Sequence, residues 1–164
     1  EPWDKGLRFS VQYSSVLHDV RSRFQHIQVL QTPALGKMLV LDDAIQTSER
    51  DESGYHEMIA HVPLCRRGRR VGGDLRVLII GGGDGGVARE VLRHKDVTRV
   101  DLVDIDEEVM NVARTHLPSI WRNPNSPADA PQPLETDERF RGNSHTASAS
   151  KAFVNPVERF LMAL

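Results

Sequence analysis

The chain has 164 residues, of which 39% are hydrophobic, and it carries a formal net charge of −2 at pH 7. This length is enough for one ordinary domain with its core, and the near-neutral charge argues against a broad basic surface for nucleic acid. No stretch approaches the roughly 18 apolar residues of a membrane span. The single cysteine, Cys65, excludes a disulfide within the chain and fits a reducing compartment, so we expect a cytoplasmic protein.

Residues 1–52 predict a small antiparallel β domain. Phe24–Leu30 alternates in polarity and is rich in Ile and Val, as a half-buried strand requires. Met38–Leu41 and Ala44–Thr47 flank the pair Asp42-Asp43, which suits a tight hairpin turn. We therefore expect short strands joined by turns in this region.

Residues 53–121 change in character and open with a predicted helix. Ser53 can cap this helix, which we expect to end near Pro63. Acidic residues gather on the preceding turns, and we expect most of them to be solvated surface charges. Tyr55 and His56 follow, and their polar and aromatic edges could contact an amine, although a histidine here can equally lie on the surface or at the edge of the core.

A βαβ unit is predicted after this helix. Leu75–Ile80 is a continuous apolar run of strand length, which is typical of a strand buried on both faces. The glycine-rich segment Gly81–Gly86 follows, and a helix then runs through Val91 and Leu92. Thr98–Val103 is a second strand and Asp106–Leu117 a second helix. Two strands joined by a crossover helix should be parallel.

Residues 122–164 differ from the rest of the chain. They begin with a proline-rich stretch that has few large apolar residues and cannot bury enough surface to offset its ordering entropy. We therefore expect a largely disordered tail. A short helix could close the chain, with Asn155 as its cap and Val157, Phe160 and Leu161 on one apolar face.

The glycine-rich segment is the strongest candidate for a ligand site. Five of its six residues are glycine: Gly81, Gly82, Gly83, Gly85 and Gly86. They satisfy G-x-G-x-x-G between a strand and a helix, where glycines let the backbone turn sharply and approach a nucleoside. The alternative is a tight turn that binds nothing, but five glycines exceed what a turn needs.

Asp84, inside this segment, favours a cationic ligand. Two like unit charges ~4 Å apart repel by about 4 kcal/mol at an effective dielectric of about 20, so a carboxylate disfavours a pyrophosphate. The same carboxylate attracts a sulfonium or an ammonium. Asp104 ends the second strand, about 20 residues further on, where an acid can bind ribose hydroxyls. An adenosyl-sulfonium compound is the better guess, while Asp84 as a simple helix cap stays open.

These residues resemble a known family. Between about residues 6 and 121 the chain is similar to the spermidine synthases, which are polyamine aminopropyltransferases. The resemblance rests on Asp51–Met58, His61–Leu64, Ile79–Gly86 and Asp104–Glu107. It implies an α/β fold, in which a small N-terminal antiparallel β domain precedes a partial Rossmann-like, methyltransferase-type doubly wound domain.

The resemblance also implies an activity and a set of contacts. Family members transfer an aminopropyl group from decarboxylated S-adenosylmethionine to putrescine in polyamine biosynthesis, with no metal and no other cofactor. Gln25 resembles the glutamine that contacts the nucleoside, and Tyr55 and His56 resemble substrate-contacting positions. Asp84 resembles the carboxylate that holds the aminopropyl ammonium. Asp104 resembles the ribose-binding acid, which is more often Glu in the family.

The likeness fades after Trp121, and this departure bears on activity. The acidic-glycine motif for the adenine side and the motif that supplies the general base are absent, so the catalytic base is unknown and we expect weak or no turnover from this chain. A homo-oligomer, dimer or tetramer, is expected through the N-terminal sheet. The alternatives are a non-catalytic partner subunit of a full-length paralogue and an S-adenosylmethionine-dependent methyltransferase. An NAD-binding module is the weakest hypothesis because of Asp84.

Overall fold

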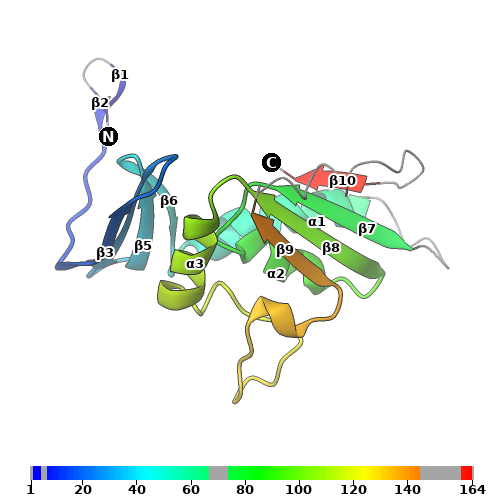
Figure 1. Ribbon diagram of the computed structural model, residues 1–164. Coiled ribbons are helices and arrows are strands. Elements are labelled where there is room, and N and C mark those ends of the chain that lie inside the picture. The colour runs from blue at the N-terminus through cyan, green and yellow to red at the C-terminus, as the bar shows by residue number, and fades with distance from the viewer. Residues whose placement is uncertain (1, 5–6, 67–73, 145–159, 164) are drawn as a thin grey trace. The chain divides into compact units, whose positions relative to one another are not determined.

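The structure, a computed structural model, describes residues 2–4, 7–66, 74–144 and 160–163 (Figure 1). The chain divides into two compact units, Glu1–Glu52 and Ser53–Leu164. Among the described residues, no helix is both long and apolar enough to cross a membrane.

The first unit is built on a four-stranded antiparallel sheet. Its strands follow one another in the order β3 (Ser15–Arg21), β4 (His26–Thr32), β5 (Gly36–Leu41) and β6 (Ala44–Ser48). A separate short antiparallel pair, β1 (Pro2–Asp4) and β2 (Leu7–Arg8), precedes it. The buried hydrophobic side chains of the sheet are those of Ile27, Val29, Met38, Leu39 and Val40.

The turn between β5 and β6 confirms the predicted hairpin. Asp42 and Asp43 have φ angles of 45° and 65°, and the strands pair directly on either side, with Leu41 opposite Ala44. Positive φ at both central residues is the geometry of a two-residue turn that matches the twist of the strands, and Asp tolerates it better than most residues.

The second unit contains a four-stranded parallel sheet. Its order is β10 (Phe160–Ala163), β7 (Leu75–Ile80), β8 (Val97–Asp104) and β9 (Phe140–Ser144), which lie side by side in Figure 1. The helices of this unit are α1 (Glu52–Arg66), α2 (Gly86–Leu92) and α3 (Glu107–His116), with a short 3-10 turn at Leu134–Thr136. This mixed α/β arrangement confirms the expected fold class.

One hydrophobic core joins the three helices to the sheet. Alternate residues of β7 and β8, among them Val77, Ile79, Val100 and Leu102, point to the same face because the side chains of a strand alternate. The helices contribute Ala60 and Leu64 of α1, Val87 and Val91 of α2, and Met110 and Ala113 of α3 to the same cluster. The packing fixes the carboxyl ends of β7 and β8 next to the starts of α2 and α3.

The expected bounds of the first helix are wrong at both ends. The helix begins at Glu52, so Ser53 lies inside it and is not its cap. It does not end near Pro63 but runs on to Arg66, with the proline within it. Proline there costs one hydrogen bond because it has no N–H, while Leu64 remains buried in the core and holds the last turn to the sheet.

The predicted C-terminal helix is also wrong where the structure describes it. Phe160–Ala163 forms a strand that pairs in parallel with β7. An edge of β7 offers this segment backbone partners, which the apolar spacing of the sequence does not reveal. The expected cap, Asn155, and Val157 lie outside the described residues.

The expectation of a disordered segment after Trp121 is wrong for residues 122–144. Leu134 and Phe140 are buried in the core, and β9 pairs with β8. Hydrogen bonds of Arg139 hold this segment in place although it has few apolar residues. Its guanidinium donates to the carbonyls of Leu92 (2.8 Å) and Val97 (3.1 Å) and pairs with Asp137 (2.7 Å). Polar contacts of this kind leave no periodic pattern of hydrophobic residues in the sequence, so they could not be predicted from it.

Candidate functional site

The glycine turn, Gly81–Gly86, lies between the end of β7 and the start of α2, at the carboxyl edge of the parallel sheet. Close approach excludes a side chain at three of its glycines, Gly83, Gly85 and Gly86. A Cβ on Gly83 would lie 2.6 Å from Oδ2 of Asp104, and a Cβ on Gly86 would lie 2.2 Å from the ring of His56. Real side chains do not make such contacts, so glycine is required at these positions. Gly81, Gly82 and Gly85 have φ angles of 78°, 72° and 84°, which other residues rarely adopt.

Asp104 closes the turn from the side of β8. Its Oδ2 accepts a hydrogen bond from the Gly83 N–H (2.9 Å) and its Oδ1 accepts one from the Asp106 N–H (2.9 Å). Burial raises the pKa of Asp104 above its ordinary value, and the charges of Asp106 and Asp84 raise it further, although the two backbone N–H groups act in the opposite direction. The carboxylate is therefore held rigidly, with lone pairs left for a ligand hydroxyl.

Asp84 lies at the tip of the turn and joins it to α1. Its Oδ1 accepts the Gly86 N–H at 2.8 Å, and its Oδ2 lies 3.3 Å from Nε2 of His56. Gly85 is the N-cap of α2, so Asp84 is not the cap, yet its bond to the first N–H of the helix satisfies a donor as a cap does. The Asp84 side chain keeps 12% of its surface exposed.

His56 and Tyr55 differ in position although they are neighbours in sequence. His56 is fully buried, and because a carboxylate only accepts, the proton of its contact with Asp84 sits on Nε2. Tyr55 is 58% exposed, and its ring meets the His56 ring edge-on with 5.3 Å between centroids. His56 thus supports the turn from beneath, while Tyr55 faces solvent beside it.

The expected site residues fall into both units. Tyr55, His56, Asp84 and Asp104 belong to the second unit, where His56, Asp84 and Asp104 all contact the glycine turn or form part of it. Gln25 belongs to the first unit, half-buried in the turn between β3 and β4, and its N–H donates to Oγ of Ser22.

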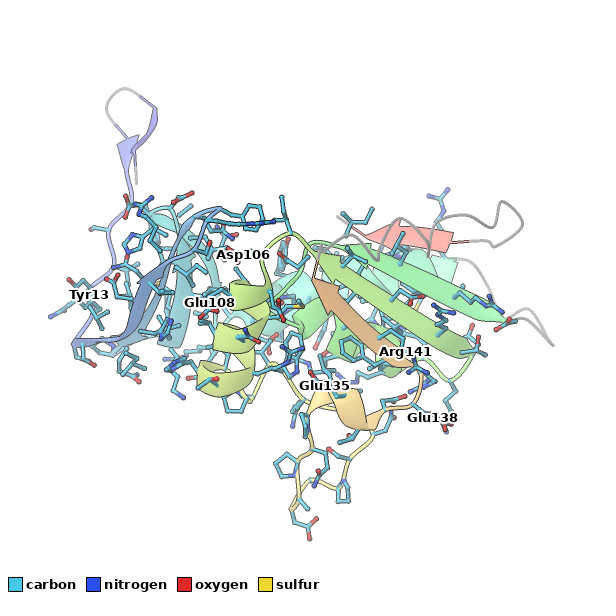
Figure 2. The ribbon with its side chains drawn as sticks, viewed as in Figure 1. Tyr13, Asp106, Glu108, Glu135, Glu138 and Arg141 are labelled. Atoms are coloured by element: carbon cyan, nitrogen blue, oxygen red, sulfur yellow. The ribbon has the colours of Figure 1, made fainter. Side chains whose placement is uncertain are left out.

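The local charge of the site is negative. Asp84, Asp104 and Asp106 are close enough for the first and last to raise the pKa of Asp104. Asp106 is the N-cap of α3 and accepts the Glu108 N–H; Figure 2 labels both at the start of that helix. Such a site favours a cationic ligand over a phosphate. Within the described residues, no group of three or more His, Cys, Asp or Glu side chains is arranged to hold a metal ion.

Sequence reasoning missed the residues behind the turn. A Cβ on Gly85 would lie 2.5 Å from the Trp121 ring and 2.9 Å from Leu134, so both side chains back the turn. Trp121 Nε1 donates to Glu135, which also accepts from Arg114 at 2.7 Å; Glu135 is labelled in Figure 2. A tryptophan soon after a helix was the available signal, but its partners come from a segment expected to be disordered.

Comparison with known proteins covers both units. Residues 52–132 match the spermine/spermidine synthase domain, and residues 1–49 match the spermidine synthase tetramerisation domain. The chain is 45% identical over 114 residues to polyamine aminopropyltransferase 1 of Pseudomonas aeruginosa, covering 70% of this chain and 38% of that protein. It is 43% identical over 119 residues to spermidine synthase 2 of Arabidopsis thaliana, covering 73% of this chain and 34% of the relative.

Solved structures give the same result. The spermidine synthase of Thermotoga maritima superposes with a TM-score of 0.69 at 33% identity, covering 83% of this chain and 42% of that one. A spermidine synthase bound to the transition-state analogue AdoDATO gives a TM-score of 0.68 at 33% identity, over 82% of this chain and 41% of that one. The chain thus spans about two fifths of the length of these relatives. In its two domain matches, its sequence relatives and its fold, the chain belongs to the spermine/spermidine synthase family.

Proposed function

We propose that this chain is the nucleoside-binding part of an aminopropyltransferase. In this proposal the glycine turn binds decarboxylated S-adenosylmethionine, Asp104 accepts from the ribose hydroxyls, and Asp84 binds the aminopropyl ammonium. Gln25 and Tyr55 are proposed as further contacts, to the nucleoside and to the amine acceptor. The observation that carries the proposal is the pair of anchored carboxylates, Asp84 and Asp104, at a turn in which Gly83, Gly85 and Gly86 have no room for a side chain.

The proposed reaction is a displacement at carbon. An amine nitrogen of putrescine attacks the carbon bonded to the sulfonium sulfur, the carbon–sulfur bond breaks, and its electron pair stays on the sulfur of methylthioadenosine. The attacking nitrogen must first lose a proton, because the pKa of an alkylamine is near that of lysine, about 10. General base catalysis of this step typically contributes about 10²- to 10⁴-fold. Among the described residues we assign no base, and the role of Asp84 is to orient the aminopropyl group.

The proposal includes the family's assembly and location. The match of residues 1–49 to a tetramerisation domain supports a homo-oligomer that forms through the N-terminal region. A single cysteine supports a cytoplasmic protein.

Substitution of Asp84 tests the site. Asp84→Asn keeps the size of the side chain but removes the charge, and a hydrogen bond to a charged group is worth roughly 1.5–3 kcal/mol. By calorimetry we expect decarboxylated S-adenosylmethionine to bind about 10- to 100-fold more weakly. Methylthioadenosine, which lacks the ammonium, should be nearly unaffected.

The control and the opposing outcomes are equally direct. Asp129→Asn changes an exposed carboxylate of the proline-rich segment and should leave both affinities unchanged. Equal losses for the two ligands would show that Asp84 does not bind the ammonium. Preference of the wild-type chain for ordinary S-adenosylmethionine would favour a methyltransferase instead.

A further inference from the structure

A second polar cluster links α1 to α2 away from the glycine turn. His61 lies on α1 five residues after His56, and its Nδ1 is 2.9 Å from Nε2 of His94, just after α2. Its Nε2 lies 3.2 Å from Oε2 of Glu90, which is 1% exposed. The proposed ligand site uses neither of the two histidines nor Glu90.

The hydrogen-bond pattern admits only certain proton positions. Burial would raise the pKa of Glu90, but hydrogen bonds from Arg89 and Arg93 outweigh burial and lower it, so Glu90 is a carboxylate that only accepts. This favours a proton on Nε2 of His61. In a neutral His61, Nδ1 then accepts, and Nε2 of His94 must donate to it. One added proton can be accommodated by reversing this bond.

A second added proton cannot be accommodated. With both rings cationic, an N–H of His61 would face an N–H of His94, and two positive charges would lie side by side. Burial and the charge of His61 lower the pKa of His94, in keeping with a pair that resists the second proton.

The other charged groups around His94 come from three elements. Glu90 belongs to α2, Arg93 is the C-cap of that helix, and Asp96 belongs to the turn that follows it. The guanidinium of Arg139, from the segment before β9, donates to the backbone carbonyl of His94 at 3.3 Å. The carboxylates of Glu90 and Asp96 favour a cationic His94, and the guanidinium of Arg93 disfavours it. These opposing effects partly cancel, so the contact with His61 is what makes the second protonation of the pair harder than the first.

The pair is mechanically connected to the candidate site. Five residues of α-helix span about 7.5 Å, so His61 and His56 lie on one rigid element. Toward the N-terminus of α1, the ring of His56 occupies the space that a Cβ of Gly86 would need. Nε2 of His56 also contacts the carboxylate of Asp84. We propose that His61 and His94 are positioning residues that fasten α1 to α2 with a single shared proton, and that double protonation releases His56 from Asp84.

The test uses the full chain without a ligand and follows the imidazole NMR signals of His56, His61 and His94 from pH 8 to pH 5. In the wild-type chain we expect His94 to gain its proton at a lower pH than an ordinary imidazole does, in the step that adds the second proton to the pair. The His56 signals should move with the second, more acidic step. A His94 that gains its proton at the ordinary pH of an imidazole, with no accompanying change at His56, would overturn the proposal.

Two substitutions of His94 distinguish the effect of the hydrogen bond between α1 and α2 from the effect of the added proton. In His94→Gln the amide nitrogen can donate to His61 but cannot titrate, so His56 should keep its pH 8 signals down to pH 5. In His94→Ala the contact is lost, and His56 should be displaced at every pH. A His56 step that persists unchanged in His94→Gln would show that His56 titrates on its own. If His94→Ala fails to fold, the wild-type and Gln titrations still decide.

A binding measurement adds a readout that rests on the proposed function. The dissociation constant for decarboxylated S-adenosylmethionine should rise about tenfold more between pH 8 and pH 5 in the wild-type chain than in His94→Gln. An equal rise in both chains would count against the coupling of the pair to Asp84. Failure of both chains to bind at any pH would refute the proposed function. The NMR titration would still test whether protonation of the histidine pair displaces His56.

Discussion

Gly86 packs so closely against the ring of His56 that it leaves no space for a larger residue. The Cβ of an alanine at position 86 would lie 2.2 Å from two atoms of a fully buried ring, so His56 would have to leave its place beside Asp84. We expect Gly86→Ala to lower the free energy of unfolding by about 1–3 kcal/mol, as overpacking does. Urea unfolding measures this loss, and calorimetry should show weakened binding of decarboxylated S-adenosylmethionine.

Gly54 provides the matched control. It lies in α1 with nothing within 4 Å of a Cβ, so Gly54→Ala should be neutral or stabilise the chain by up to about 1 kcal/mol. Equal stability of Gly86→Ala and Gly54→Ala would mean that His56 does not pack against the turn.

Asp104 gives a prediction about pH. Burial raises its pKa above the ordinary 3.8, so the folded chain binds this proton more tightly than the unfolded chain does. The stability of the wild-type chain relative to Asp104→Asn should therefore be greatest below pH 3.8 and decline as the pH rises through the raised pKa. Urea unfolding of both chains from about pH 3.5 to pH 7 measures this difference. A difference that grows with pH would mean that the N–H groups of Gly83 and Asp106 outweigh burial.

Much of the site at this scale followed from sequence. The glycines, Asp84 and Asp104 could be placed because a strand, a glycine run and a helix leave few ways to arrange them. The burial of His56 could not be predicted, since Gly86, which covers it, lies far away in sequence, on another helix. Gln25 could be placed in a turn, and its proposed contact with a nucleoside remains a prediction.

Among whole helices and strands, the pattern of apolar residues correctly predicted the strands whose structure is determined by those residues alone. β7 and β8 are bounded by turn signals and rich in apolar residues, and both were predicted to within one residue at each end. β3 was missed because His18 and Asp19 interrupt its apolar residues, and β9 because Phe140 is its one large apolar side chain. Such strands are specified by their neighbours in the sheet and by contacts such as those of Arg139.

The role of Arg139 as a clamp is testable. Its fork of donors joins the segment before β9 to the carbonyls of Leu92 and Val97, and lysine keeps the charge but cannot form these bonds together. We expect Arg139→Lys to cost about 2–4 kcal/mol of unfolding free energy and to speed amide exchange in β9. Arg141→Lys, at an exposed neighbour, should change stability by less than about 0.5 kcal/mol. Unchanged exchange in β9 would show that core packing alone holds the strand.

At the scale of the whole molecule, the parallel sheet is larger than the two strands expected from sequence. β7 and β8 each have a neighbour on both sides, so their backbone groups are paired across the sheet. Fewer backbone groups are therefore left without a partner than in a sheet of two strands. The first unit, in contrast, carries exposed apolar side chains on β3, where the register shifts between Val16 and His18.

This irregular strand leads to a prediction about assembly. Val16 and Leu17 are 44% and 39% exposed, in the region that matches the tetramerisation domain. If β3 lies in a contact between copies, the exposed part of Leu17 becomes buried there. Leu17→Lys then removes an apolar contact worth roughly 1.5–3 kcal/mol and should raise the dissociation constant about 10- to 100-fold. Sedimentation velocity over a range of concentrations measures this shift toward the monomer.

The control for assembly lies on the other edge of the same sheet. Gln46 of β6 is exposed and polar, so Gln46→Lys adds the same charge without removing an apolar contact. It should leave the sedimentation profile unchanged, which would separate a specific contact at β3 from general charge repulsion. A wild-type chain that sediments as a monomer at every concentration would contradict assembly through this unit. Equal effects of the two lysines would place the contact elsewhere than on β3, because only Leu17 contributes apolar surface there.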